Sequence, residues 1–354
     1  MLTRRCVLRL AAGCAVLPAW AARAAEEAPT GRFGIAALKE GYLKRIAAIR
    51  AAGKLPIFDI ESSYDPGKID LEDFVREMDR TGVAVMAFSP DMPGRLVKKG
   101  ETWSHHVFEL IRLYPDRFYP TGNGGVHPAW TKNQERFLDD NERYILAHGY
   151  PLMGEFEFRH YMSPRQAERN ETHRDVDIPI DGAAGERLFA FAETTGIPFQ
   201  IHYEIEDRLL PPLEAMLARH PKAKVIWCHL AQIRYKERST LYTPDYLRGL
   251  FARFPNLYID TAFGGPYGIY KPSGQRHARV WTDGGDIRPE WSALIAEQPY
   301  RFLAALDIGG DRMDRLDDWV RNLRYFLDRL PEPARRIVAY RAAWKLLFNE
   351  EIGV

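Results

Sequence analysis

The chain has 354 residues, which suits one large domain or two ordinary ones. Its 49 basic and 48 acidic residues nearly cancel, so it lacks the strong net charge that recruits nucleic acid or an anionic membrane surface. Hydrophobic residues make up 46% of the chain, enough for a large core, and we expect a small molecule as its partner and no nucleic acid.

The first 25 residues have the three parts of a secretion signal. A basic start with Arg4 and Arg5 precedes an apolar run at residues 10–20 and an alanine-rich end at residues 21–25. The run is too short to span a membrane as a helix, and the arginine pair resembles the twin-arginine type of signal. A chance arginine pair in a general secretion signal is the alternative. In either case we expect removal of residues 1–25, no stable membrane insertion afterwards, and a periplasmic mature protein.

The cysteines exclude an internal disulfide. Cys6 and Cys14 lie in the expected signal, which leaves Cys228 alone in the mature chain. Cys14 is also a candidate for lipid attachment, but the apolar run continues past it, which favours cleavage near Ala24. Because neighbouring side chains of a strand point to opposite faces, we expect Cys228 to pack against helices rather than beside His229.

From residue 55 onward the chain repeats one pattern: an amphipathic helical run, a break at glycine or proline, and a compact apolar strand. Gly82, Gly149 and Gly196 are breaks of the first kind. The expected strands cover residues 55–60, 83–88, 117–119, 153–158, 199–203, 225–228, 257–259 and 302–306. Strands that alternate with helices predict parallel pairing, because each crossover needs a helix to return the chain.

This pattern predicts an α/β fold, a single-domain (β/α)8 TIM barrel at residues 55–354, preceded by a lead-in segment at residues 26–54. An open doubly wound sheet is the alternative, but no glycine-rich phosphate loop follows the first strand. Two long inserts, residues 159–183 and 262–290, follow strands. Loops in that position lie on the face where barrel enzymes place their sites, so both inserts are candidate lids.

Polar side chains gather at the ends of the expected strands. Strand alternation aligns Glu61 with Ser63, Glu155 with Glu157 and Arg159, and Trp227 with His229, while His202 and Asp307 end two further strands. Buried charges are too costly to stand alone, so this convergence predicts ion pairs, a metal site or a catalytic site.

Six short phrases, in a fixed order, resemble the amidohydrolase-related branch of the amidohydrolase superfamily, a group of metal-dependent hydrolase TIM barrels. They occupy residues 58–64, 153–155, 201–202, 225–229, 256–260 and 301–307, and the resemblance runs from about residue 55 to residue 348. It implies that His202 is the metal ligand of the fifth strand. It further implies that His229 polarises a substrate carbonyl and that Asp307 orients or deprotonates water.

The first strand departs from this family. Members usually carry His-x-His where this chain has Glu61 and Ser63. A carboxylate and a hydroxyl should bind zinc more weakly than two imidazoles do. We therefore expect a carboxylate-rich site for a divalent metal ion such as zinc, manganese or iron, with the ligands Glu61, Glu155, His202 and Asp307. Members of the superfamily without a metal leave a metal-free site as the alternative.

Cations and an aromatic residue near the same strand ends are candidates for substrate binding. The guanidinium group suits carboxylate recognition because its fork binds both oxygens, so Arg159, Arg234 and Arg276 are expected to bind a carboxylated substrate. Trp227 would supply an apolar wall. The alternatives are ordinary loop charge, or a structural ion pair of Arg159 or Arg234 with one of the glutamates.

These observations favour an exported hydrolase of the amidohydrolase type that acts on a small carboxylated molecule. His229 and Asp307 would be its catalytic residues. A decarboxylase or lactonase of the same branch is one alternative. A catalytically silent binding protein that kept the barrel and lost its first two ligands is the other.

Overall fold

Eight strands close into a parallel barrel in the computed structural model, which describes residues 31–65, 67–90, 102–231, 234–276 and 279–353. The expected TIM barrel is therefore confirmed. The barrel strands are β1 (Ile57–Ser63), β2 (Val83–Ser89), β3 (Phe118–Pro120), β4 (Met153–His160), β6 (Phe199–Tyr203), β7 (Val225–Trp227), β8 (Leu257–Asp260) and β11 (Phe302–Leu303).

Backbone hydrogen bonds close the barrel at its two irregular seams. Between β3 and β4, the backbone N–H of Gly125 donates to the carbonyl of Glu155 at 2.7 Å. Between β11 and β1, the N–H of Ile60 donates to Ala304 at 3.0 Å, and that of Asp307 donates to Glu61 at 3.0 Å. The second seam continues beyond the end of β11, which brings residue 307 beside the end of β1.

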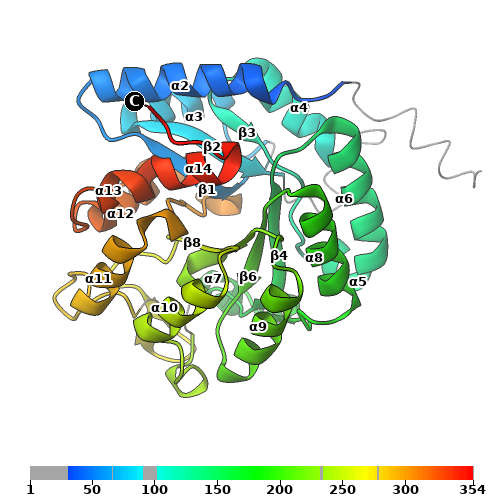
Figure 1. The fold of residues 1–354 in the computed structure, drawn as a ribbon, viewed down its shortest axis with the longest axis vertical. Helices are drawn as coiled ribbons and strands as arrows, with labels where there is room; N and C mark the ends of the chain where they lie inside the picture. Colours follow the sequence, from blue (N-terminus) through cyan, green and yellow to red (C-terminus); the bar gives the residue numbers. More distant parts are fainter. Residues whose placement is uncertain (1–30, 66, 91–101, 232–233, 277–278, 354) are drawn as a thin grey trace, which may run out of the picture.

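Helices surround the strands, as Figure 1 shows. Gly82, Gly149 and Gly196 end α3, α6 and α8 in the left-handed conformation, with φ of 78°, 70° and 73°, as their positions in the sequence predict. The helices are α2 (Ile35–Ala51), α3 (Leu71–Thr81), α4 (Trp103–Leu113), α5 (Ala129–Lys132), α6 (Gln134–His148), α7 (Pro164–Glu168), α8 (Ala183–Thr195), α9 (Leu210–Arg219), α10 (Pro244–Arg253), α11 (Pro289–Glu297), α12 (Leu316–Leu327), α13 (Ala334–Arg336) and α14 (Ala342–Phe348).

The lead-in segment contains α2, which packs on the barrel at the end opposite to the site. Tyr42 and Ile46 are fully buried in the same core as the strands. The Tyr42 hydroxyl donates to the carbonyl of Phe118 at the start of β3, and the Arg45 guanidinium donates to Val83 and Ala84 at the start of β2. Helix α2 is thus an integral part of the domain.

The two inserts carry short strands of their own. Within the first, β5 (Val176–Asp177) pairs antiparallel with the end of β4. Within the second, β9 (Ile269–Tyr270) and β10 (Gln275–Arg276) form a hairpin. Both inserts follow strands, so they lie over the end of the barrel at which the expected site residues meet.

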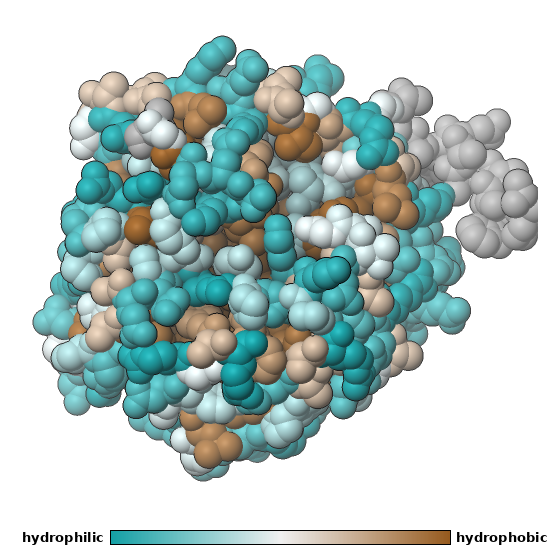
Figure 2. All heavy atoms as spheres, in the orientation of Figure 1, coloured by the Kyte–Doolittle hydropathy of each residue, from teal (hydrophilic) through white to brown (hydrophobic). Residues whose placement is uncertain are grey.

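The visible surface is largely hydrophilic, with scattered hydrophobic residues (Figure 2). Among the described residues, every helix is too short or too polar to cross a membrane. The expected export signal at residues 1–25 lies outside the described residues.

Candidate functional site

A cavity of about 830 Å³ opens at the C-terminal ends of the barrel strands. Both inserts contribute to its walls, the first through residues such as Arg165 and Arg174 and the second through Phe263 and Gly264. Its volume suits a small organic molecule. Of the expected site residues, those that line it are Glu155, His202, His229, Arg234 and Asp307, together with Ser63 of the first strand.

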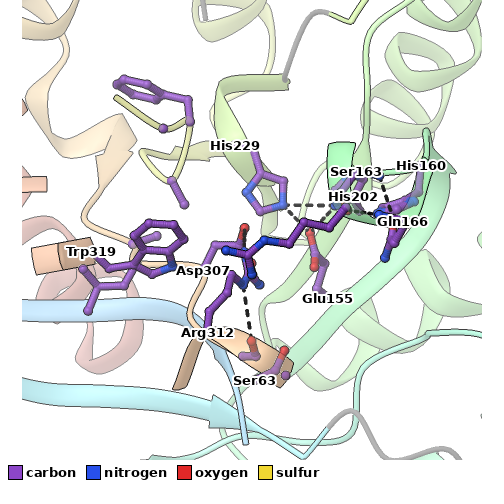
Figure 3. A pocket seen from close by; sticks show the side chains of 18 of the residues that line it. Ser63, Glu155, His160, Ser163, Gln166, His202, His229, Asp307, Arg312 and Trp319 are labelled. Atoms are coloured by element: carbon purple, nitrogen blue, oxygen red, sulfur yellow. Dashed lines mark hydrogen bonds and ion pairs between the residues drawn. The ribbon is translucent and has the colours of Figure 1, made fainter. Parts of the chain in front are cut away.

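Glu155, His202 and His229 meet on the floor of this cavity (Figure 3). Oε1 of Glu155 lies 2.8 Å from Nδ1 of His202 and 2.8 Å from Nε2 of His229, and the two ring nitrogens are 3.0 Å apart. Because the residues come from β4, β6 and the turn after β7, three neighbouring strands place one carboxylate and two imidazoles at a single point. The three donor atoms lie close enough together to hold one metal ion.

The pKa values of the two histidines in this cluster show that a cation there would replace their protons. Burial alone would lower the pKa of His202, but the carboxylates of Glu155 and Glu204 outweigh it and raise that pKa to about 10. Burial likewise opposes the charge of His229, and the Glu155 carboxylate raises its pKa. The buried Glu155 carboxylate therefore attracts positive charge to both imidazoles, and a divalent ion can take the place of their protons.

The backbone at two site residues adopts the left-handed conformation that side chains other than glycine avoid. His229 has φ 60° and Asp307 has φ 48°. Such strain persists only where the surroundings hold it, and it is common at functional sites. At His229 the Asp260 carboxylate stabilises this conformation. Its Oδ1 accepts the backbone N–H groups of His229 at 2.8 Å and Ala262 at 3.0 Å.

Asp307 lines the cavity, and its carboxylate there is paired with an arginine. The Arg312 guanidinium donates to both of its carboxylate oxygens, at 2.8 and 2.9 Å, and the two side chains face each other beside Ser63 in Figure 3. A bidentate pair of this kind is strong and directional. Arg312 comes from the loop after β11 and was not among the expected site residues.

Glu61 does not line the cavity with Glu155 and His202, although its backbone carbonyl accepts the N–H of Asp307 at 3.0 Å. It is 3% exposed, lies behind the cavity floor, and groups instead with His229 and Asp260. Burial raises the pKa of Glu61 well above its usual range, and the negative charges of Asp307 and Glu155 raise it further. Of the four expected ligands, Glu155 and His202 thus share one group, Glu61 belongs to a second group that also contains His229, and Asp307 belongs to neither.

Trp227 and Cys228 occupy the opposite faces from those expected. Trp227 is fully buried in the core, where its ring packs against Tyr242 and its indole N–H donates to the carbonyl of Tyr203 at 2.7 Å. Cys228 is buried near the carboxylates of Asp260, Glu155 and Glu61, and burial together with these charges raises the pKa of its thiol. His229 points into the cavity only because its backbone is in the left-handed conformation, which strand alternation does not predict.

Arg159 turns away from the cavity because β4 contains a bulge. The register of β4 against β6 shifts between Glu157 and Arg159, so the alternation of side chains changes phase there. Arg159 is consequently buried in ion pairs with Glu206 at 2.8 Å and Asp175 at 2.6 Å. Its place on the cavity wall is taken by His160, whose ring lies 4.5 Å from that of His202.

The other two expected substrate arginines have different surroundings. Arg234 lines the cavity, pairs with Glu204 at 2.6 Å and stacks over the Tyr270 ring. Arg276 lies away from the cavity in the β9–β10 hairpin, where it donates to the carbonyl of Thr282 at 2.8 Å. A short hairpin strand at the protein surface gives no sequence signal of which way its side chains turn.

Glu204 and Arg174 are further polar residues near the site that were not among the expected site residues. Oε1 of Glu204 lies 3.5 Å from Nε2 of His202, within ion-pair distance but without a hydrogen bond, and Arg234 pairs with the same oxygen of Glu204 at 2.6 Å. Arg174, in the first insert, pairs with Glu157 on the cavity wall. Glu204 follows His202 by one strand period and was identifiable by alternation, whereas Arg174 depends on how a loop folds back.

One wall of the cavity is apolar. Phe263, Leu323 and Phe326 are buried and line it, and Trp319 lies beside them (Figure 3). The indole Nε1 of Trp319 is buried and has no hydrogen-bond partner among the described residues.

Comparison with known proteins follows from this geometry. The sequence of residues 61–313 matches the family described as amidohydrolase. The chain belongs to the amidohydrolase family. No curated protein of known function matches the sequence significantly.

Solved structures share the fold of this amidohydrolase. A putative amidohydrolase from Staphylococcus aureus is 15% identical with a TM-score of 0.50, over 83% of this chain and 99% of that chain. A dihydroxybenzoic acid decarboxylase from Polaromonas sp. JS666, solved with bound manganese and the inhibitor 2-nitroresorcinol, is 13% identical with a TM-score of 0.49, over 83% of this chain and 98% of that chain. At 15% identity the likeness to the Staphylococcus aureus protein concerns the fold alone.

Proposed function

We propose that this amidohydrolase is a metal-dependent enzyme that hydrolyses a small carboxylated molecule. The observation that carries the proposal is the meeting of Glu155, His202 and His229 on the floor of a cavity at the catalytic end of the barrel. A carboxylate and two imidazoles suit zinc, manganese or iron. Perturbed histidines in a cleft support a functional site rather than a structural ion pair.

A divalent ion bound by this cluster would polarise a carbonyl and lower the pKa of bound water. Glu155, His202 and His229 would hold this ion, and Glu204 would lie near Nε2 of His202. Asp307, once released by Arg312, would accept a proton from water at the cavity mouth. The apolar wall of Phe263, Leu323 and Phe326 would exclude bulk water.

The cationic side chains support a carboxylated substrate. Arg312 already binds the carboxylate of Asp307 through two donors, which is the geometry that a substrate carboxylate would copy. Arg165 and Arg234 line the same cavity. A carboxylate that exchanges with Asp307 on Arg312 would both bind the substrate and free the base.

A decarboxylase is the second candidate, and the Asp307–Arg312 pair favours it. If Arg312 stays on Asp307, the carboxylate is a poor base for water, and hydrolysis loses its proton acceptor. A substrate carboxylate placed against the apolar wall would lose solvation, which favours its departure as carbon dioxide. The protonated His202 would then supply a proton to the carbon left behind.

Turnover assays separate these reactions. The manganese-loaded and chelator-treated chains would be incubated with carboxylated esters, lactones and amides, and with aromatic carboxylic acids. Release of acid without carbon dioxide in the loaded chain alone supports the hydrolase, and release of carbon dioxide supports the decarboxylase. Binding without turnover on the whole panel would contradict both and support the binding protein.

Export to the periplasm is a further part of the proposal, and it rests on the signal-like residues 1–25. Mass spectrometry of the chain purified from its native cell would test it. We expect a mature N-terminus near residue 25 in the periplasmic fraction. An intact Met1 on protein in the cytoplasm would contradict export.

A further inference from the structure

Arg174 is a cation that the fold holds on the cavity wall. It ends the short turn η2 (Thr172–Arg174) of the first insert and lines the cavity. Two residues of β4 hold it there. Its carbonyl accepts a hydrogen bond from Nδ1 of His160 at 2.6 Å, and its guanidinium pairs with the carboxylate of Glu157. Backbone and side chain are thus both tied to one strand, which fixes the position of the charge.

The pair with Glu157 uses only part of the Arg174 guanidinium. A single nitrogen, Nη2, contacts a single carboxylate oxygen, Oε1. Nε and Nη1 of Arg174 have no hydrogen-bond partner among the described residues, and neither is shut off from solvent. The side chain is 18% exposed, so these donors remain available to a molecule in the cavity.

Arg159, which belongs to the same strand, shows how this fold uses an arginine for structure alone. Its Nε donates to Glu206 at 2.8 Å and its Nη1 to Asp175 at 2.6 Å, so both sides of the guanidinium are occupied. The pair of Arg174 and Glu157 is incomplete by comparison, since Oε2 of Glu157 is buried and has no partner in the described part of the chain. A contact that served only to neutralise Glu157 would satisfy both of its oxygens. The open geometry therefore indicates a second partner for Arg174.

Arg312 lies on the opposite side of the barrel from Arg174. The strands follow the order β1, β2, β3, β4, β6, β7, β8 and β11 around the closed barrel, so β4 and β11 stand across from each other. Arg174 is held by β4, and Arg312 follows β11. Both line the cavity whose floor carries Glu155, His202 and His229. The cavity thus has one arginine that can bind a carboxylate on each of two opposite walls.

We propose that Arg174 binds a second anionic group of the substrate, which is therefore a dicarboxylate that spans the cavity. This inference rests on the proposed function, in which Arg312 binds the first carboxylate. The guanidinium fork suits a carboxylate at either end. Two anchors on opposite walls hold the middle of the molecule over the floor, where the reaction is proposed, whereas a monocarboxylate is fixed at one end only.

Binding of unreactive acids tests this inference without any turnover. Calorimetric titration of the purified chain gives the dissociation constants of succinate, glutarate, adipate and pimelate. The matched ligands are butyrate, pentanoate, hexanoate and heptanoate, which have the same carbon numbers and one carboxylate. The wild type should bind at least one dicarboxylate about 10-fold or more tightly than its match, the factor expected for one additional charge-assisted contact.

Four variants separate the anchor from general charge. Arg174→Gln and Arg312→Gln should each remove the preference for the dicarboxylate, because each leaves one anchor. Arg169→Gln, at an exposed cavity-lining arginine that pairs with Glu171, is the matched control and should keep it. Glu157→Gln removes the competing carboxylate and should keep or raise it. If circular dichroism shows that Arg174→Gln unfolds with Glu157 unpaired, the double variant Glu157→Gln with Arg174→Gln takes its place.

The outcomes distinguish this inference from the proposed function. A wild type without the preference, or an Arg174→Gln variant that retains it, overturns the second anchor, while turnover of a monocarboxylated ester would leave the proposed function standing. A preference that is lost as expected in a chain without turnover on the substrate panel supports the dicarboxylate site and overturns the proposed reaction. A chain that binds none of these acids also overturns the second anchor.

Discussion

The Asp260 carboxylate holds the turn that presents His229 to the cavity. Its Oδ1 accepts the backbone N–H of His229 at 2.8 Å, and His229 has φ 60°. The carboxylate is fully buried, so water does not compete for this hydrogen bond. One acidic residue at the end of β8 thereby sets the position of an imidazole at the end of β7.

Removing this acceptor should release the strained turn. We expect Asp260→Ala to lower the free energy of unfolding by about 2 kcal/mol, because it leaves two buried N–H groups unpaired. Asp260→Asn keeps an oxygen acceptor and should cost clearly less. Urea unfolding of both variants measures the difference, and equal losses would show that the carbonyl oxygen does not hold the turn.

His202→Ala should abolish activity while the fold survives. The side chain joins Glu155 on the cavity floor, and its loss removes one metal donor and the counter-charge to that carboxylate. We expect at least a 100-fold fall in kcat, of the order seen when an acid, base or metal ligand is removed. His220→Ala, at a histidine between Glu186 and Glu193, is the control and should retain activity. Loss of the circular dichroism signal in His202→Ala would instead assign it a structural role.

Glu206 should stabilise the protein in a pH-dependent way. Burial alone would raise its pKa, but hydrogen bonds from Tyr161, Arg159 and Arg208 outweigh it and lower the pKa to about 2. A depressed carboxyl pKa gives stability that is present above the unfolded pKa of about 4.3 and is lost as the pH falls toward 2.

Glu206→Gln should therefore cost about 2 kcal/mol at neutral pH and about half of that near pH 3. Denaturant unfolding at both pH values measures the change. Glu168→Gln breaks only an exposed pair with Lys271 and should cost much less than Glu206→Gln does at neutral pH. A constant loss for Glu206→Gln across this range would contradict the assigned ion pair.

Cys228 should be inert in the folded protein despite its position next to His229. The thiol is buried, and burial together with nearby carboxylates raises its pKa, so no thiolate is available. We expect the peptide that contains Cys228 to stay unlabelled by iodoacetamide until the chain is denatured. Labelling of the native chain, detected by mass spectrometry, would support a nucleophilic role for the Cys228 thiol.

The fold and part of the site follow from local sequence signals. Helical runs that end at Gly82, Gly149 and Gly196, each followed by an apolar strand, predict the barrel, because these glycines adopt left-handed caps. His202 lies in a regular strand, so its place on the cavity floor follows from its position near a strand end.

The remainder depends on departures from regular strands. A bulge in β4 turns Arg159 outward and His160 inward, and no residue type in that segment announces it. The left-handed turn at His229 is set by Asp260, which is distant in sequence, so alternation misplaces Trp227 and Cys228. Such features arise from contacts between strands rather than within them.

The most direct test of the metal-dependent account is an anomalous diffraction measurement on crystals of the manganese-loaded chain. The account predicts a peak about 2.0–2.3 Å from Oε1 of Glu155 and from ring nitrogens of His202 and His229. That peak should vanish in Glu155→Gln. An active, manganese-loaded chain without a peak at these three side chains would contradict the account.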